Sequence, residues 1–374
     1  MTACAWAVRG GALLFLITAP PFVGAGATQE LRPRAREVGI EIGMLDPGPF
    51  NAITDVEGVR VGHRTVVMGD SIRTGVTAIL PHGGNLFADK VPGAIVVRNG
   101  FGKLVGLSQV NELGQIETPI LLTGTLSVFR VADALVDTLL ADPANAEVTS
   151  INPVVGETND GYLSDIRARP IEPLHVREAL RGASSGAVAE GSVGAGTGTR
   201  ALGWKGGVGT ASRHLPESAG GYTIGVLVQS NYGGLLTIAG VPVGRFVRSD
   251  RPDVPARDDR EGGSVMIVIA TDAPLAHREL SRVAERAFAG IARTGSWMSH
   301  GSGDYAIAFS VHRGAVDAPD GEVMTRLFVA TAEAVEEAVL NSLFKATTTV
   351  GYRGRRAEAL PVAEVLEVVR RHTP

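Results

Sequence analysis

The stretch Arg257–Leu275, RDDREGGSVMIVIATDAPL, joins a charged segment to an apolar run through two glycines and one serine, Ser264. Nine of the 18 residues at positions 246–263 are charged, and two others are Pro252 and Pro255, so this segment is predicted to be an exposed, mobile linker. The following run, SVMIVIAT, predicts a buried strand that begins at Ser264. A lone hydroxyl at the first residue of a rigid strand has a well-defined position, which favours a chemical role.

The bond between Gly263 and Ser264 has the chemistry required for an N-to-O acyl shift. In that reaction the Ser264 hydroxyl attacks the Gly263 carbonyl, and the resulting ester is hydrolysed. Glycine before the bond removes side-chain hindrance and tolerates strained backbone angles. Cleavage would leave Ser264 with a free α-amine of pKa roughly 7.7–8.0, close enough to neutrality to act as a base for its own hydroxyl. Taken alone, the tripeptide GGS is more typical of a plain turn before a strand.

The composition excludes several functional classes. Of the 374 residues, 44% are hydrophobic and 20% are charged, which predicts a folded protein with one large core or two smaller ones. The formal net charge of −4 gives no electrostatic reason to expect a nucleic acid or an anionic membrane as partner. Cys4 is the single cysteine, so an intramolecular disulfide and cysteine-based metal sites are excluded. The eight histidines have no metal-binding spacing, and we expect neither a metal nor another cofactor.

The N-terminus has the pattern of an export signal. Arg9 is the only early charge, and an apolar stretch from Gly11 to Val23 follows it. The stretch is too short for a spanning helix and ends in the small residues AGA, at Ala25–Ala27, which predict cleavage before Thr28. We therefore expect residues 1–27 to be a signal peptide and the mature protein to be periplasmic or secreted, with no membrane association once the signal is removed.

Short apolar runs punctuated by glycine predict strands over much of the first part of the chain, and helical spacing dominates the last part. FRVADALVDTLL, Phe129–Leu140, predicts one helix, and residues 275–294 predict an amphipathic helix with Leu280 to Ile291 on its apolar face. A long helix over 324–346 and a final one from about Pro361 follow. Strands and long helices without strict alternation predict an α+β fold, and an αββα sandwich in a single domain, 28–374, is the expected architecture.

Ten blocks of the chain together resemble the DmpA/β-peptidyl aminopeptidase family, the L-aminopeptidase/D-amidase-esterases, which are self-processing serine hydrolases of the N-terminal-nucleophile type. The resemblance runs from about Arg34 to the C-terminus, and the blocks occur in the family's order. They are NAITDVEGVRVGH, GVTAILPHGG, PVVGETNDGYLSD, EGSVGAGTGT, KGGVGTASR, GYTIGVLVQSNYG, LTIAGVPVG, GGSVMIVIATDAPL, ARTGSWMSHGSGDYAIAFS and TAEAVEEAVLNSL.

The resemblance implies a role for individual residues. Ser264 matches the nucleophile, and Gly263–Ser264 matches the processing bond, so that the precursor yields a large chain, 28–263, and a small chain, 264–374. Ser302 and Asp304 match the second serine and the carboxylate that assist the nucleophile. Asn231 matches the oxyanion donor, and losing one such donor typically costs about 10²–10³ in rate. Glu157 matches the acid that receives the substrate's free amino group.

One substrate-binding position departs from some members of the family. Asn159 lies where those members carry a tyrosine, and asparagine is shorter and has a different set of donors. A D-amide or ester preference that depends on the phenol is therefore not expected. The resemblance implies an aminopeptidase that releases N-terminal residues from small peptides, amides or esters, with β- or D-residues left open, and a homo-oligomer, a tetramer of heterodimers.

Two other functions fit the same fold. An acyltransferase of the ornithine acetyltransferase type also cleaves itself, but that family uses threonine where this chain has Ser264. A non-catalytic binding protein has no need of Ser264, Ser302, Asp304 and Asn231 together. The glycine-rich run at 194–199 lacks the Lys-Ser/Thr ending of a phosphate loop and is interpreted as a turn near the site. His300 is interpreted as a solvated or structural residue, and Arg355 and Arg356 as a solvated charge cluster.

Overall fold

The computed structural model describes residues 1–2, 32–248, 263–314 and 319–372, and residues 32–374 form one compact unit. The predicted signal peptide and most of the predicted linker lie outside the described residues. The ends of that linker are described, and they are not exposed throughout, because Val247 and Gly263 are both buried. In the described part of the chain no helix is both long and apolar enough to span a membrane.

Two sheets form the centre of the molecule. The first has the order β1-β2-β5-β6, and the second has the order β4-β3-β12-β11-β10-β9. Their strands are β1 Arg60–Met68, β2 Ile72–Leu80, β5 Ile120–Gly124 and β6 Val154–Thr158 in the first sheet, and β3 Val91–Gly100, β4 Gln115–Ile116, β9 Val208–His214, β10 Thr223–Asn231, β11 Ser264–Thr271 and β12 Gly303–Ser310 in the second. Two-stranded pairs are formed by β7 Arg200–Ala201 with β8 Trp204–Lys205 and by β13 Thr349–Val350 with β14 Arg356–Ala357.

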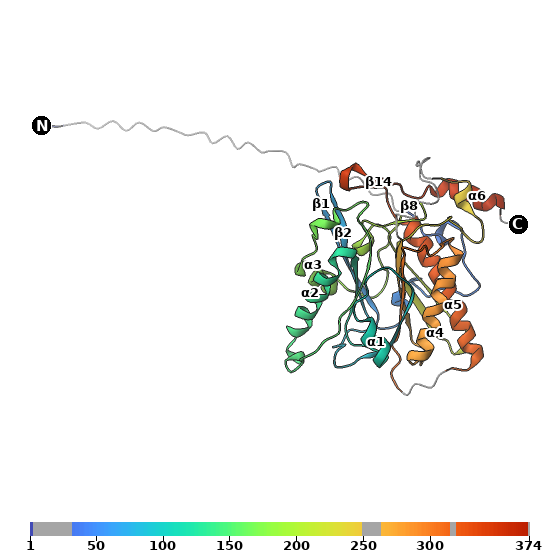
Figure 1. Ribbon diagram of the computed structural model, residues 1–374, viewed down its shortest axis with the longest axis horizontal. Helices are drawn as coiled ribbons and strands as arrows, with labels where there is room; N and C mark the ends of the chain where they lie inside the picture. Colours follow the sequence, from blue (N-terminus) through green and yellow to red (C-terminus); the bar gives the residue numbers. More distant parts are fainter. Residues whose placement is uncertain (3–31, 249–262, 315–318, 373–374) are drawn as a thin grey trace. The chain divides into compact units, whose positions relative to one another are not determined.

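Helices cover the outer face of each sheet, which gives the expected αββα sandwich (Figure 1). Helices α2 (Val128–Leu140) and α3 (Pro173–Arg181) pack on the four-stranded sheet, and α4 (His277–Arg293) and α5 (Gly321–Phe344) pack on the six-stranded sheet. Helix α1 (Leu107–Leu113) lies beside β3, and α6 (Val362–His372) ends the described chain. The expectations for α2, α4, α5 and α6 are confirmed to within a few residues, whereas α1 and α3 carry no pattern that we interpreted.

Three apolar layers account for the sandwich. Met266 and Tyr305 belong to the layer between the two sheets, and Val265 and Ala306 belong to the layer between the six-stranded sheet and its helices. Strands buried on both faces read as continuous apolar runs without alternation, which is why SVMIVIAT is apolar throughout. Helix α4 has the expected apolar face, with Leu280, Val283, Ala284, Ala287, Phe288 and Ile291 buried.

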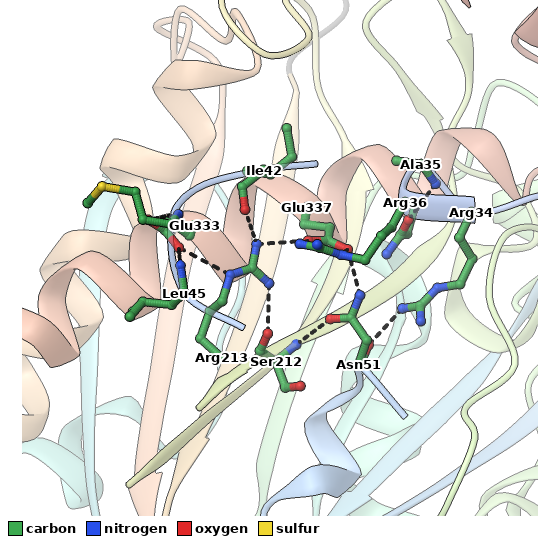
Figure 2. Close-up of polar contacts among 12 residues, drawn as sticks. Arg34, Ala35, Arg36, Ile42, Leu45, Asn51, Ser212, Arg213, Glu333 and Glu337 are labelled. Atoms are coloured by element: carbon green, nitrogen blue, oxygen red, sulfur yellow. Dashed lines mark hydrogen bonds and ion pairs between the residues drawn. The ribbon is translucent and has the colours of Figure 1, made fainter. Parts of the chain in front are cut away.

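A buried ionic network fixes the segment around Arg36 and helix α5 to the second sheet (Figure 2). Arg213, at the end of β9, has no exposed surface and contacts two carboxylates of α5, with its Nε 3.2 Å from Glu333 and its Nη2 2.8 Å from Glu337. Glu337 also accepts from Arg36 and from the Asn51 side chain. Burial alone would raise the pKa of Glu337, but the hydrogen bond from Arg36 and the charge of Arg213 hold that pKa below its usual value.

Arg213→Met is expected to lower the free energy of unfolding by about 3–5 kcal/mol, because methionine fills the space but leaves two buried carboxylates without their shared cation. The measurement is the midpoint of urea unfolding.

The matched control is Arg293→Met, because Arg293 is half exposed and lies 3.6 Å from Glu336. Its loss should cost less than about 1 kcal/mol. Equal effects of the two substitutions would contradict a structural role for the buried network.

Candidate active site

Ser264 is the first residue of β11, where three strands of the second sheet meet. It pairs with Asn231, the last residue of the antiparallel strand β10, and with Gly303, the first residue of the parallel strand β12. Its side chain is buried between the two sheets, with 4% of the residue exposed. The ladders on both sides of β11 fix the backbone at Ser264, so the position of the hydroxyl is set by the sheet itself.

The Asn231 amide faces Ser264 in a defined orientation. Its Oδ1 accepts a hydrogen bond of 3.0 Å from the backbone N–H of Arg200, which leaves the amide NH₂ as the end able to donate elsewhere. Residues directly opposite each other in an antiparallel pair project to the same face, with Cβ atoms about 4.5–5.5 Å apart. The Asn231 NH₂ therefore lies on the same face as the Ser264 hydroxyl, where an oxyanion donor is needed.

Asn159 contacts Ser264 through its backbone. Its N–H lies 3.4 Å from Ser264 Oγ, just after the end of β6, and its side-chain Oδ1 accepts a hydrogen bond of 2.9 Å from the N–H of Gly161. The side chain thus closes a local turn, as asparagine commonly does. A direct substrate contact through the Asn159 amide stays a prediction, while the backbone N–H beside the nucleophile is a feature that side-chain reasoning missed.

Glu157, in β6, is a buried carboxylate held by several donors. Its Oε1 accepts a hydrogen bond of 3.0 Å from the backbone N–H of Lys103, and its Oε2 accepts from the Thr125 hydroxyl. The Lys103 ammonium lies 3.6 Å from Oε1, on a side chain that is 40% exposed. A buried carboxylate whose cationic partner is a partly exposed lysine has the charge to receive a second ammonium group.

Ser302 and Asp304 form a hydrogen-bonded pair beside the start of β11. The Ser302 hydroxyl donates to Asp304 Oδ1 at 2.6 Å, and both residues are buried. Asp304 Oδ2 has no hydrogen-bond partner among the described residues. Burial raises the pKa of Asp304 to about 6, although the hydrogen bond from Ser302 opposes that shift.

The strand register separates this pair from the Ser264 hydroxyl. Asp304 is aligned with Val265, whereas Ser264 is aligned with Gly303, and successive residues of a strand point to opposite faces. Among the described residues the Ser302 hydroxyl donates to Asp304, and its assistance to Ser264 stays a prediction. The register thus places the Asp304 side chain on the opposite face of the sheet from the Ser264 hydroxyl.

Asp160 and Lys205 are two further buried ionisable residues. Asp160 follows Asn159, and burial raises its pKa to about 7, while burial lowers the pKa of Lys205 to about 7 and the charge of Asp160 partly offsets that shift. The Lys205 ammonium donates to the carbonyls of Gly196 and Gly206. The glycine-rich run at 194–199 thus includes a turn held by Lys205, as its interpretation as a turn near the site anticipates. His300, in contrast, is exposed.

The fold and the placement of a serine at the start of a central strand define the class of N-terminal-nucleophile hydrolases. Residues 51–357 match the model of peptidase family S58, and the chain belongs to that family. It is 38% identical to the β-peptidyl aminopeptidase BapA of Sphingosinicella microcystinivorans, over 93% of this chain and 94% of the relative. The protein is therefore a hydrolase of peptide bonds with aminopeptidase activity.

Two solved structures show the same fold. The structure of the PH0078 protein from Pyrococcus horikoshii superposes with a TM-score of 0.84 at 46% identity, covering 91% of this chain and 99% of that one. The L-aminopeptidase D-Ala-esterase/amidase of Ochrobactrum anthropi, described as a prototype of serine aminopeptidases and a variant of the N-terminal-nucleophile hydrolase fold, gives 0.82 at 36% identity with the same coverage. These relatives confirm the family resemblance and the fold class expected from the sequence.

Asp304→Asn is expected to stabilise the protein at pH 8 while lowering its activity. A carboxyl group whose pKa rises from about 3.9 to about 6 on folding contributes stability below pH of about 4 and loses it as the pH rises through 6. Asparagine removes that cost and keeps an oxygen for Ser302, so the free energy of unfolding should rise by about 1–2 kcal/mol at pH 8 and by much less at pH 4.

Urea unfolding at the two pH values, together with kcat/KM, measures both effects. Glu322→Gln is the control, since Glu322 is an exposed carboxylate at the start of α5. A destabilised Asp304→Asn variant at pH 8 would show that the carboxylate is a structural requirement of the fold.

Proposed function

We propose that the protein is an exported serine aminopeptidase that cleaves its own chain between Gly263 and Ser264 and then removes N-terminal residues from short peptides, amides or esters. One observation carries the proposal. Ser264 begins a strand that is paired on both sides, and it lies opposite an asparagine amide whose orientation is fixed by a backbone donor.

The geometry around the Gly263 carbonyl supports self-cleavage. That oxygen accepts a hydrogen bond of 3.0 Å from the N–H of Gly303, which polarises the carbonyl toward attack. Gly263 is buried, and a Cβ atom at this position would lie 2.9 Å from both Cα and Cβ of Tyr232. The residue before the nucleophile is thus held in a space that only glycine fits.

In turnover, the free α-amine of Ser264 acts as the base for the Ser264 hydroxyl. Attack on the substrate carbonyl places negative charge on its oxygen, and the Asn231 NH₂ and the Asn159 N–H are the donors nearest the nucleophile for that charge. The Ser302–Asp304 pair assists the nucleophile, as the family resemblance implies, and the hydrogen bond of 2.6 Å within the pair orients the Ser302 hydroxyl. The intermediate then collapses as the scissile C–N bond breaks and the leaving amine takes the proton held by the Ser264 amine, and water hydrolyses the acyl-enzyme ester.

The Glu157 carboxylate accounts for the preference for substrates with a free N-terminal amine. A free N-terminal ammonium group displaces the Lys103 ammonium and pairs with the buried carboxylate. The similarity to a β-peptidyl aminopeptidase supports N-terminal β-residues as substrates. The proposal also includes export, which rests on the N-terminal sequence pattern, and a homo-oligomer of processed heterodimers, which rests on the family resemblance.

Self-cleavage predicts two bands on a denaturing gel for the wild-type protein, the smaller beginning at Ser264, and one band for Ser264→Ala. Gly263→Ala is expected to slow cleavage at least tenfold, because the added Cβ meets the backbone of Tyr232. The fraction cleaved is followed over time after synthesis.

Gly233→Ala is the matched control for the second variant, since a Cβ at Gly233 meets no atom within 4 Å. It should be processed at the wild-type rate. One full-length band in an active wild-type preparation would rule out the proposed mechanism.

Recognition of the ammonium group predicts that Glu157→Gln raises KM for substrates with a free amine by at least tenfold, because a charge-assisted interaction is lost. N-acetylated substrates should be cleaved poorly by both proteins. Equal kcat/KM values of the wild type for free and acetylated peptides would exclude Glu157 as the ammonium receptor.

A further inference from the structure

Arg355 lies beside the turn that carries Asn159, although the sequence favours a solvated position for it. Its Nη1 lies 3.4 Å from the carbonyl oxygens of Gly161 and Tyr162, and its guanidinium carbon lies 5.3 Å from the centre of the Tyr162 ring. Arg355 is partly buried. Its neighbour Arg356 behaves differently, because it is exposed and pairs with Glu358. The two arginines therefore do not form one solvated cluster.

The charge of Arg355 has no carboxylate within ion-pair distance in the parts of the chain that the structure describes. Its contacts there are two carbonyl oxygens at the long end of the hydrogen-bond range and the faces of two tyrosine rings, Tyr162 and Tyr352. A guanidinium group has five donors in a planar fork that matches a carboxylate. Arg355 thus retains donors for an anion while its other contacts hold it in place.

A second cation lies over the same tyrosine ring. The guanidinium carbon of Arg200 is 3.8 Å from the centre of Tyr162, and the backbone N–H of Arg200 is the donor that orients the Asn231 amide. Tyr162 is three residues beyond Asn159, whose N–H contacts the nucleophile. Arg200 therefore contacts Asn231 directly, and Arg355 contacts the turn that follows Asn159.

The order of the strands indicates which end of the substrate faces these cations. Lys103, next to the ammonium receptor Glu157, follows the end of β3, and the sheet continues through β12, β11 and β10 toward Arg200. Lys103, the partner of Glu157, thus follows a strand on one side of β11, and Arg200 contacts Asn231 of β10 on the other side. A substrate whose ammonium lies at Glu157 and whose carbonyl lies at Asn231 directs its leaving group toward the Tyr162 turn.

We propose that Arg355 binds the carboxylate of a leaving group that is a single free amino acid, so that dipeptides are the preferred substrates. This inference rests on the proposed function, because it takes the substrate's orientation from Glu157, Ser264 and Asn231. One residue spans only about 3.3–3.6 Å of extended chain, so the carboxylate of a dipeptide stays close to the scissile bond, on the side of the Tyr162 turn. A longer peptide or a C-terminal amide presents no charge there.

The test compares a dipeptide with its C-terminal amide, both with the same N-terminal residue, by kcat/KM. The wild type should prefer the dipeptide by about tenfold or more, in line with the strength of a charge-assisted hydrogen bond. Arg355→Met should reduce that preference to less than about threefold by slowing the dipeptide alone, and Arg355→Lys should keep part of it. The preference of the wild type should also fall as salt is raised.

Arg353→Met is the matched control, because Arg353 is exposed and lies over Tyr352 in the same loop. It should leave the preference unchanged. The amide rate reports that each variant is folded and processed. A wild type that cleaves both substrates equally, or an Arg355→Met variant that loses both rates together, overturns the inference while the proposed function stands. A wild type that cleaves neither substrate, with Ser264 uncut, overturns both.

Discussion

The pairing of β11 on both sides is the constraint on which the rest of the structure depends. A strand with an antiparallel neighbour and a parallel neighbour cannot shift its register without breaking both ladders. Ser264 therefore keeps its place opposite Asn231 and next to Gly303, whether or not the chain before it is intact. The sheet supplies the rigidity that a reactive serine at a chain terminus would otherwise lack.

The proposed cleavage before Ser264 would divide the sandwich between two chains, so contacts across that division would have to hold it together. Strands β11 and β12 lie in the middle of the second sheet with strands from the earlier part of the chain on both sides, and helix α5 covers that sheet. The Arg213 guanidinium on β9 adds a buried electrostatic link to Glu333 and Glu337 of α5. Separating the chains would expose the apolar strands and leave these charges unpaired, and both effects are unfavourable.

The sequence predicts the strongest parts of this fold because their patterns are local. The apolar run after Ser264 and the apolar face of Leu280–Ile291 define β11 and α4 without reference to the rest of the chain. The glycines and the ten blocks also identify the residues of the candidate site, but they do not show which atoms face one another. The contact of the Asn159 backbone with Ser264 follows from the packing of β6 in one sheet against β11 in the other, and the position of Arg355 follows from a loop nearly 200 residues away from the turn it contacts. Such long-range contacts leave no periodic signal in the sequence.

Four unpaired polar atoms of the described residues belong to β6, β10 and β12 or directly follow β6, and all three strands contact β11. Asp304 Oδ2, Thr158 Oγ1, Asp160 Oδ2 and Gln229 Oε1 are all buried without a partner. Each such atom costs free energy, so a protein selected for stability alone would have replaced them. The proposed cleavage would add an α-amine at Ser264, and the proposed substrates would add an ammonium and a carbonyl, all of which need partners in a buried place. Under the proposed mechanism, these unpaired polar groups are partners for charges that appear only after cleavage and substrate binding. The apolar layers on both sides of the sheet supply the stability that offsets the cost of burying these groups unpaired.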